Sequence, residues 1–373
     1  MSEYQCYEFV AVDRPLTAKQ MDELRAISTR AEISPTRFWN EYEWGDLKAD
    51  PAKLMERYFD AHVYFANWGT HRLMLRLAKA RVNAKALKPY FGVGHAARLT
   101  TVGEHVLLDL GSDTEEPEDD EQHGSLAALC PLRAELMRGD LRPAYLAWLL
   151  AVEGAHVDDD VEEPAVPAGL AELTGAQETM VDFLRIDVDL VAAAAGGSAA
   201  VTDDGAPFRR WLAALSDKQK TAWLRRAAEE PDLALGGELL RAFRATTKGD
   251  RDSPRRTVGE LRALAAAQRD ARERAELARA NKARAAADAA RQRRLTALGR
   301  HIEVAWTKLE KLVETSRYDE ATTLAVDLRD LATRDDAAED FASRFEAMRR
   351  RRVRRRGFFD RWKWANDHGA RTQ

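Results

Sequence analysis

Acidic and histidine side chains lie among aromatic residues in the first part of the chain. Glu41, Asp60 and His62 are the candidates for catalysis, because a carboxylate and an imidazole within reach of a substrate can transfer protons. The alternative is a structural role. Glu41 and Glu43 fall on the same side of an expected strand, which is typical of a solvated face, and a lone histidine is more often structural than catalytic. The structural interpretation is favoured, and enzymatic activity stays an open alternative.

A second group of residues, near the end of the chain, has the composition of a binding site. Between residues 349 and 363 there are nine Arg or Lys side chains and one acid, with aromatic residues among them. Clustered arginines bind phosphates, and aromatic rings stack on bases or enter a groove of a protein partner. The predicted binding residues are Arg349, Arg350, Arg351, Arg352, Arg354, Arg355, Arg356, Phe358, Phe359, Arg361, Trp362, Lys363 and Trp364.

Several interpretations of this tail remain open. It binds nucleic acid, or it binds a protein partner, or the aromatic residues form a short helix that folds back on the preceding helices. In the last case the arginines are solvated or pair with the acidic segment of the same chain. A separate interpretation is that the arginines only complement the C-terminal end of the last helix. A protein partner or self-docking is favoured, nucleic acid is the next choice, and a membrane surface is not expected. The oligomeric state is left open.

Cofactor and metal sites are not expected. The chain has only Cys6 and Cys130, too few for a disulfide framework or a four-thiolate zinc site. The acidic run at 158–163 lacks the ligand spacing of a calcium loop. The glycines at 92 and 94 have the spacing found in dinucleotide-binding loops. Such a loop follows a strand, whereas these glycines follow an expected helix, so a dinucleotide site is not predicted.

Charge is distributed unevenly along the chain. Residues 1–200 contain 34 acids and 19 bases, whereas residues 201–373 contain 28 acids and 39 bases. A dense acidic run at 113–121 includes a proline, and like charges extend a chain, so residues 112–124 are expected to form a solvated linker. Two cysteines, no visible signal peptide and no apolar run of membrane-spanning length favour a cytoplasmic protein.

The elements that position these residues begin with a small α+β domain at 1–111. Strands are expected near 4–12, 38–44, 63–66, 72–77 and 104–110, and helices after a capping box at Thr17 and Gln20 and near 51–61. In the strand at 72–77, alternate leucines are predicted to face one way, and Arg72, Met74 and Arg76 the other.

Helices are expected from residue 125 to the end of the chain. Residues 125–250 read as a helical domain, with a capping box at Ser216. A third capping box, at Thr257, opens a long Ala/Arg-rich helix over 257–315, in which a seam begins at Leu295 and packs against helices at 316–350. Asp336 is predicted to cap the last of these helices. Residues 351–373 form the basic-aromatic tail.

Segments of the chain resemble known families. Residues 7–17, 54–61, 66–70, 73–77 and 103–106 resemble a widespread bacterial family of uncharacterised proteins. Residues 318–348, with Tyr318 and Ala321 and the run 327–332, resemble the tail of bacterial SWIM zinc-finger proteins, although the zinc ligands of a SWIM domain are absent. The resemblance implies no catalytic residue. It implies a companion of DNA-associated, defence-like systems.

Taken together, the sequence predicts an α+β head followed by mainly helical domains, with a long helix and C-terminal helical hairpins. The predicted function is that of a non-enzymatic cytoplasmic adaptor whose basic arm binds a protein partner, nucleic acid or both. The alternative is an enzyme of unknown reaction with a site in the aromatic and acidic cleft of the head.

Overall fold

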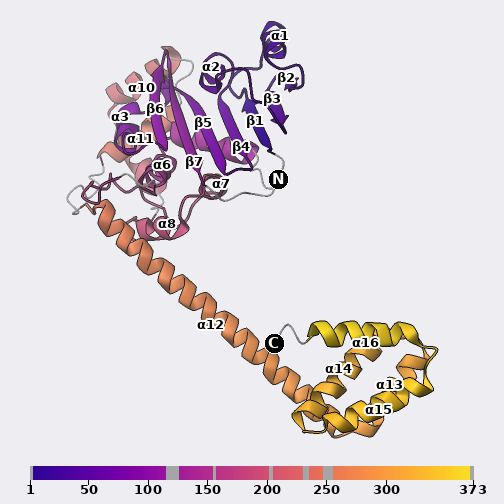
Figure 1. The fold of residues 1–373 in the computed structure, drawn as a ribbon. Coiled ribbons are helices and arrows are strands. Elements are labelled where there is room, and N and C mark those ends of the chain that lie inside the picture. Colours follow the sequence, from indigo (N-terminus) through magenta and orange to yellow (C-terminus); the bar gives the residue numbers. More distant parts are fainter. Residues whose placement is uncertain are drawn as a thin grey trace. The chain divides into compact units, whose positions relative to one another are not determined.

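The computed structural model describes residues 3–114, 126–153, 157–200, 205–229, 235–246 and 255–369. The chain divides into two compact units, Met1–Ala271 and Arg272–Gln373, which are described separately here. The predicted fold class is confirmed. An antiparallel seven-stranded sheet comes first, and a mostly helical part with a long helix and C-terminal helices follows (Figure 1).

The first unit is built on a sheet whose strand order is β2-β3-β1-β4-β5-β7-β6. All its pairings are antiparallel. The strands are β1 (Gln5–Val10), β2 (Glu32–Ser34), β3 (Arg37–Tyr42), β4 (Ala61–Ala66), β5 (Thr70–Ala78), β6 (Ala97–Val102) and β7 (His105–Asp113). The two edge strands, β2 and β6, were not predicted, since both are short or largely exposed and have no strong apolar alternation.

One face of the sheet supports the main core. The alternate leucines Leu73, Leu75 and Leu77 face one way, as predicted, and are fully buried against helices. These helices are α4 (Leu126–Leu129), α5 (Pro131–Met137), α6 (Arg142–Glu153), α7 (Gly175–Phe183) and α8 (Val188–Ala195). Their apolar residues and those of the strands form a single core, because an isolated sheet face must be covered to bury its apolar side chains.

The opposite face is covered over only part of its width. Helices α1 (Ala18–Ile27) and α2 (Pro51–Arg57) pack there on Phe9, Phe38 and Met74. Thr17 caps α1 in the predicted capping box. On the β6 side of the same face, Arg98 and Thr100 are exposed.

The helices after the sheet do not form the separate domain expected at 125–250. The helices between residues 126 and 195 share the core of the sheet, and so does the start of the long helix α12 (Val258–Gly299), through Val258 and Leu261. The physical reason is that these helices are apolar on the side that covers the strands. The predicted acidic linker at 112–124 begins inside β7, and residues 115–125 lie outside the described residues.

Further helices complete the first unit. They are η1 (Lys79–Arg81), α3 (Ala84–Leu87), η2 (Lys88–Tyr90), α9 (Gly205–Ala214), α10 (Asp217–Glu229) and α11 (Leu235–Thr246). Phe208, Trp211 and Phe243 hold α9 and α11 together, with ring centroids 5.6–5.9 Å apart.

The second unit contains the rest of α12 together with α13 (Ile302–Glu314), α14 (Tyr318–Arg334), α15 (Ala338–Arg351) and α16 (Arg356–Gly369). The helix expected over 257–315 is therefore divided, because α12 ends at Gly299 and α13 starts at Ile302. Glycine is a poor helix former, so Gly299 is a position at which the helix can end. Ile302, expected in the seam, is 40% exposed.

Among the described residues, none of the helices has both the length and the apolar character needed to cross a membrane.

Candidate functional site

The three catalytic candidates from the sequence are not brought together. Paired residues in an antiparallel sheet face the same side. Glu41 pairs with Cys6 and then Phe65, whereas His62 pairs with Phe9 and then Phe38, so Glu41 and His62 belong to opposite faces. Glu41 is exposed and accepts a hydrogen bond from the Tyr4 hydroxyl at 3.2 Å.

Asp60 is the centre of a buried ionic network. Its side chain is 1% exposed and accepts hydrogen bonds from the amides of Val12 at 2.7 Å and Asp13 at 2.9 Å. The guanidinium of Arg76 donates to the other oxygen at 2.8 Å, and that of Arg133 lies 3.6 Å away. Burial alone would raise the pKa of Asp60, but these donors and charges outweigh it, and the pKa is lowered. The carboxylate thus joins the start of β4 to β5, α5 and the chain after β1.

His62 is enclosed between aromatic rings. Its ring stacks on Phe9 with a centroid separation of 3.9 Å, and Nδ1 lies 2.9 Å from the Glu8 carbonyl oxygen, so Nδ1 carries the proton and donates. Burial lowers the pKa of His62 to about 3, so the ring is neutral at physiological pH. Within the described residues Nε2 has no hydrogen-bond partner. Such a group is inaccessible to a substrate in this conformation.

The predicted binding tail begins in the last turn of α15 and continues, from Arg356, as the packed helix α16. Phe358 is fully buried in the core of the second unit, and Phe359 and Trp362 are partly buried beside it. The Trp362 ring lies 4.8 Å from that of Phe345. These contacts hold α16 against the preceding helices. This arrangement corresponds to the interpretation in which the aromatic residues form a helix that folds back on the chain. Trp364, on the other side of α16, is 66% exposed.

Several arginines of the tail form ion pairs inside the second unit. Arg351 contacts Glu310 at 2.8 Å, and Arg352 contacts Glu314. Arg355 donates to the Glu314 carbonyl at 2.7 Å and to the Ser316 hydroxyl at 3.0 Å. Looser contacts are longer than 3.5 Å and connect exposed side chains: Arg349 and Arg350 with Glu346, and Arg361 with Asp319.

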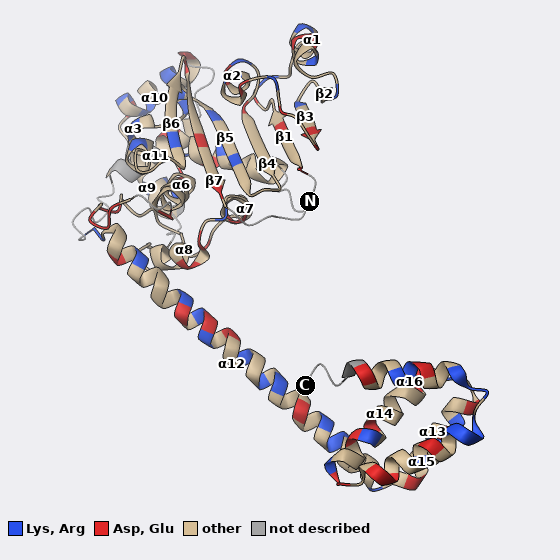
Figure 2. Ribbon diagram, in the orientation of Figure 1, with Lys and Arg blue, Asp and Glu red and all other residues tan. Residues whose placement is uncertain are grey.

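Three exposed cations of the tail have neither a hydrogen-bond nor an ion-pair partner for their side chains among the described residues, and Arg355 is held by a carbonyl and a hydroxyl rather than by an acid. Arg354, Arg356 and Lys363 are exposed and make no ion pair there, and we call them the basic surface. Arg356 and Lys363 are seven residues apart on α16, so they lie on the same side of that helix. Figure 2 shows Lys and Arg gathered where α15 leads into α16.

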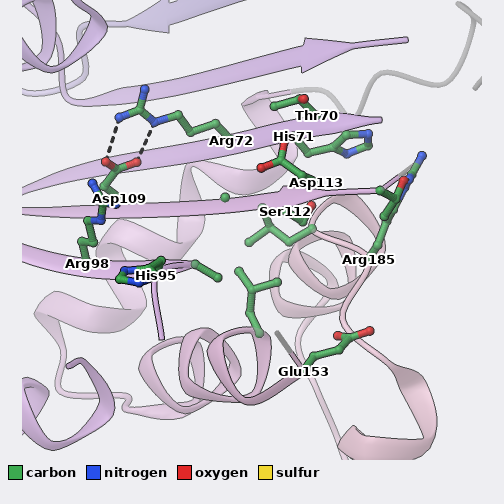
Figure 3. Close-up of a pocket in the computed structure, with 15 residues that line it drawn as sticks. Thr70, His71, Arg72, His95, Arg98, Asp109, Ser112, Asp113, Glu153 and Arg185 are labelled. Atoms are coloured by element: carbon green, nitrogen blue, oxygen red, sulfur yellow. Dashed lines mark hydrogen bonds and ion pairs between the residues drawn. The ribbon is translucent and has the colours of Figure 1, made fainter. Parts of the chain in front are cut away.

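A pocket of about 630 Å³ lies in the first unit, at the end of the sheet where β6 begins and β7 continues beyond it. No feature of the sequence predicted it. Its lining comes from β5, β6, β7, the end of α6 and the segment after α7 (Figure 3). The polar lining residues include Thr70, His71, Arg72, His95, Arg98, Asp109, Ser112, Asp113, Glu153 and Arg185.

Several charged and titratable side chains that line this pocket are held by neighbouring groups. Arg72 donates two hydrogen bonds to Asp109, both of 2.7 Å, and so occupies both of its oxygens. His71 is held by the carbonyl of Phe183, and burial lowers the pKa of its ring. Burial also raises the pKa of Glu153, whose carboxylate accepts from the Asp187 amide at 3.1 Å.

No three His, Cys, Asp or Glu side chains come together as a metal site in the parts of the chain that the structure describes. Comparison with protein-family models, curated proteins and solved structures finds no match to the chain. The functional argument therefore rests on the geometry of the basic surface and of the pocket.

Proposed function

We propose that the chain is a non-enzymatic accessory protein, an adaptor in a DNA-associated bacterial system of the cytoplasm, whose C-terminal unit binds the phosphate backbone of a nucleic acid. The observation that supports this most strongly is the exposure of Arg354, Arg356 and Lys363 with no acidic partner among the described residues. A polyanion that neutralises such cations releases counterions, and this release favours binding.

The packing of α16 bears on how binding would occur. Phe358 is fully buried, so its ring cannot stack on bases without unfolding α16, and Trp362 is partly buried and packs on the same core. Only Trp364 among the tail's aromatic residues is largely exposed. We therefore expect contacts with phosphates more than with bases, and little dependence on sequence.

The test measures the affinity of the full chain for a labelled DNA duplex by fluorescence anisotropy over a salt series. The variant Arg354→Gln, Arg356→Gln, Lys363→Gln removes the basic surface. Each lost phosphate contact flattens the slope of log K against log salt by about 0.9, so three contacts flatten it by about 2.7. Between 50 and 200 mM salt, the wild type should then lose about 40-fold more affinity than the variant.

A matched control removes three exposed lysines of the first unit, in the variant Lys48→Gln, Lys53→Gln, Lys85→Gln. It changes the net charge by the same amount and should bind as the wild type does. The proposal is overturned if the duplex does not bind, or if both variants lose affinity equally. If the tail variant loses a protein that co-purifies after nuclease treatment, but loses no DNA affinity, the partner is a protein.

A further inference from the structure

The sheet-end pocket of the first unit contains a cation that the fold itself does not neutralise. In the strand register, Arg98 of β6 lies directly opposite Asp109 of β7, on the same face as Arg72 of β5. One carboxylate thus lies between two guanidinium groups. Both of its oxygens accept from Arg72, and Arg98 has no acidic partner among the described residues.

A histidine adds to this side of the pocket. His95 is exposed and lines the same wall as Arg98, just before β6 begins (Figure 3). It follows Gly94, whose φ of +62° lets the chain turn against the end of α6, where a Cβ would lie 3.0 Å from the Ala151 carbonyl oxygen. The backbone geometry that places His95 therefore depends on a glycine, and the histidine and Arg98 form one basic wall.

The opposite wall contains a strained residue. Arg185 follows α7 with a φ of +55°, in the left-handed region where glycine is favoured after a helix. A side chain other than glycine costs roughly 1–2 kcal/mol there. Its guanidinium donates to the Thr114 hydroxyl at the rim of the pocket. Strain of this kind tends to persist where a side chain has a functional position.

The remaining lining limits the kind of ligand. Leu150 and Leu184 border the pocket but are only 5% and 0% exposed, and the volume of about 630 Å³ lies within the range of small-molecule sites. Arg72 and Asp109 cancel each other, whereas Asp113 and Glu153 lie away from the His95 wall (Figure 3). An acidic group on the ligand would meet the basic wall, and a small organic body would occupy the rest of the pocket.

We propose that this pocket is a binding site for a small organic anion, whose phosphate or carboxylate group is held by Arg98 and His95. Both groups offer negatively charged oxygens, to which a guanidinium donates short, strong hydrogen bonds. The site is separate from the basic surface, and the proposal does not depend on nucleic-acid binding.

The experiment is isothermal titration of the full chain with phenyl phosphate, benzoate and benzyl alcohol at constant ionic strength. Phenyl phosphate or benzoate should bind and benzyl alcohol should not. The stronger of the two anions distinguishes a phosphate site from a carboxylate site. Arg98→Gln should weaken binding by about ten-fold or more, because it removes a charge-assisted hydrogen bond. Arg98 is exposed, so this variant should melt as the wild type does.

Two controls and a labelling readout complete the test. Lys85→Gln, outside the pocket lining, and the basic-surface variant should both bind the anion as the wild type does. Bound anion should also protect Arg98 from modification by phenylglyoxal, measured by mass spectrometry. The proposal is wrong if neither anion binds, if Arg98→Gln binds as tightly as Lys85→Gln, or if Arg98 is modified equally with and without the anion.

Discussion

Replacing Asp60 by asparagine should destabilise the first unit strongly. The side chain of Asp60 is 1% exposed, and its charged neighbours Arg76 and Arg133 are 11% and 3% exposed. Asparagine keeps the shape but leaves the buried guanidinium group of Arg76 without its counter-charge, whereas Arg133 keeps its ion pair with Asp13. Breaking a buried pair in this way costs about 3–5 kcal/mol, a large part of the total stability of a domain.

Differential scanning calorimetry of the full chain measures this effect. At about 2–4 °C per kcal/mol for a unit of this size, the transition of the first unit should fall by roughly 6–20 °C. The control is Glu32→Gln, which removes an exposed ion pair with Arg37 whose atoms are 3.8 Å apart. Such pairs contribute about 0.2–1 kcal/mol, so the control should melt within a few degrees of the wild type.

A double variant tests the reasoning itself. If Asp60 acts by neutralising Arg76, then Asp60→Asn combined with Arg76→Gln should cost less than the sum of the two single changes. The structural role would be refuted if Asp60→Asn melted with the wild type, or if the two changes were simply additive. A stable Asp60→Asn protein that lost a biological activity would instead revive the catalytic interpretation of this residue.

Two further predictions concern His62 and Phe358. His62 has a folded pKa of about 3 against an ordinary value of 6.5, so the unfolded chain binds the extra proton between these values, and stability falls as the pH drops below 6.5. The loss should approach about 1.4 kcal/mol per pH unit in urea unfolding, and His62→Asn should remove this part of the slope; equal slopes would contradict it. Phe358→Ala should destabilise the second unit by about 3–5 kcal/mol in thermal unfolding, since the ring is fully buried. An exposed substitution in the same helix, Lys363→Ala, is the control, and equal melting of the two variants would mean that α16 is not docked.

Local signals in the sequence predicted local structure well. The capping boxes at Thr17, Ser216 and Thr257 are all present, with the hydroxyl of each accepting from an amide three residues later at 3.2–3.3 Å. Such bonds depend only on a short stretch of chain. The cap predicted at Asp336 is wrong, because Asp336 has a φ of +55° and Ala337 is the N-cap of α15.

Features that depend on distant parts of the chain were not predictable. Arg133 was read as part of a separate helical domain, yet its buried guanidinium donates to Asp13 at 2.8 Å. The pocket combines residues that lie between positions 70 and 185 of the chain. Arg98 lies opposite Asp109 in the strand register, but Asp109 forms its ion pair with Arg72, so Arg98 has no acidic partner among the described residues. A single sequence shows neither which strands pair nor which charged side chains form ion pairs.

The charge asymmetry of the sequence overstates the cationic surface that the C-terminal unit offers. Most of its arginines have acidic neighbours in the same unit: Arg291 contacts Asp330 at 2.5 Å, Arg344 contacts Glu303 at 2.5 Å, and Arg351 and Arg352 contact Glu310 and Glu314. A polyanion must compete with these acids for every paired arginine. The salt dependence of binding should therefore reflect a few phosphate contacts, centred on Arg354, Arg356 and Lys363, and not the nine cations that the tail contains.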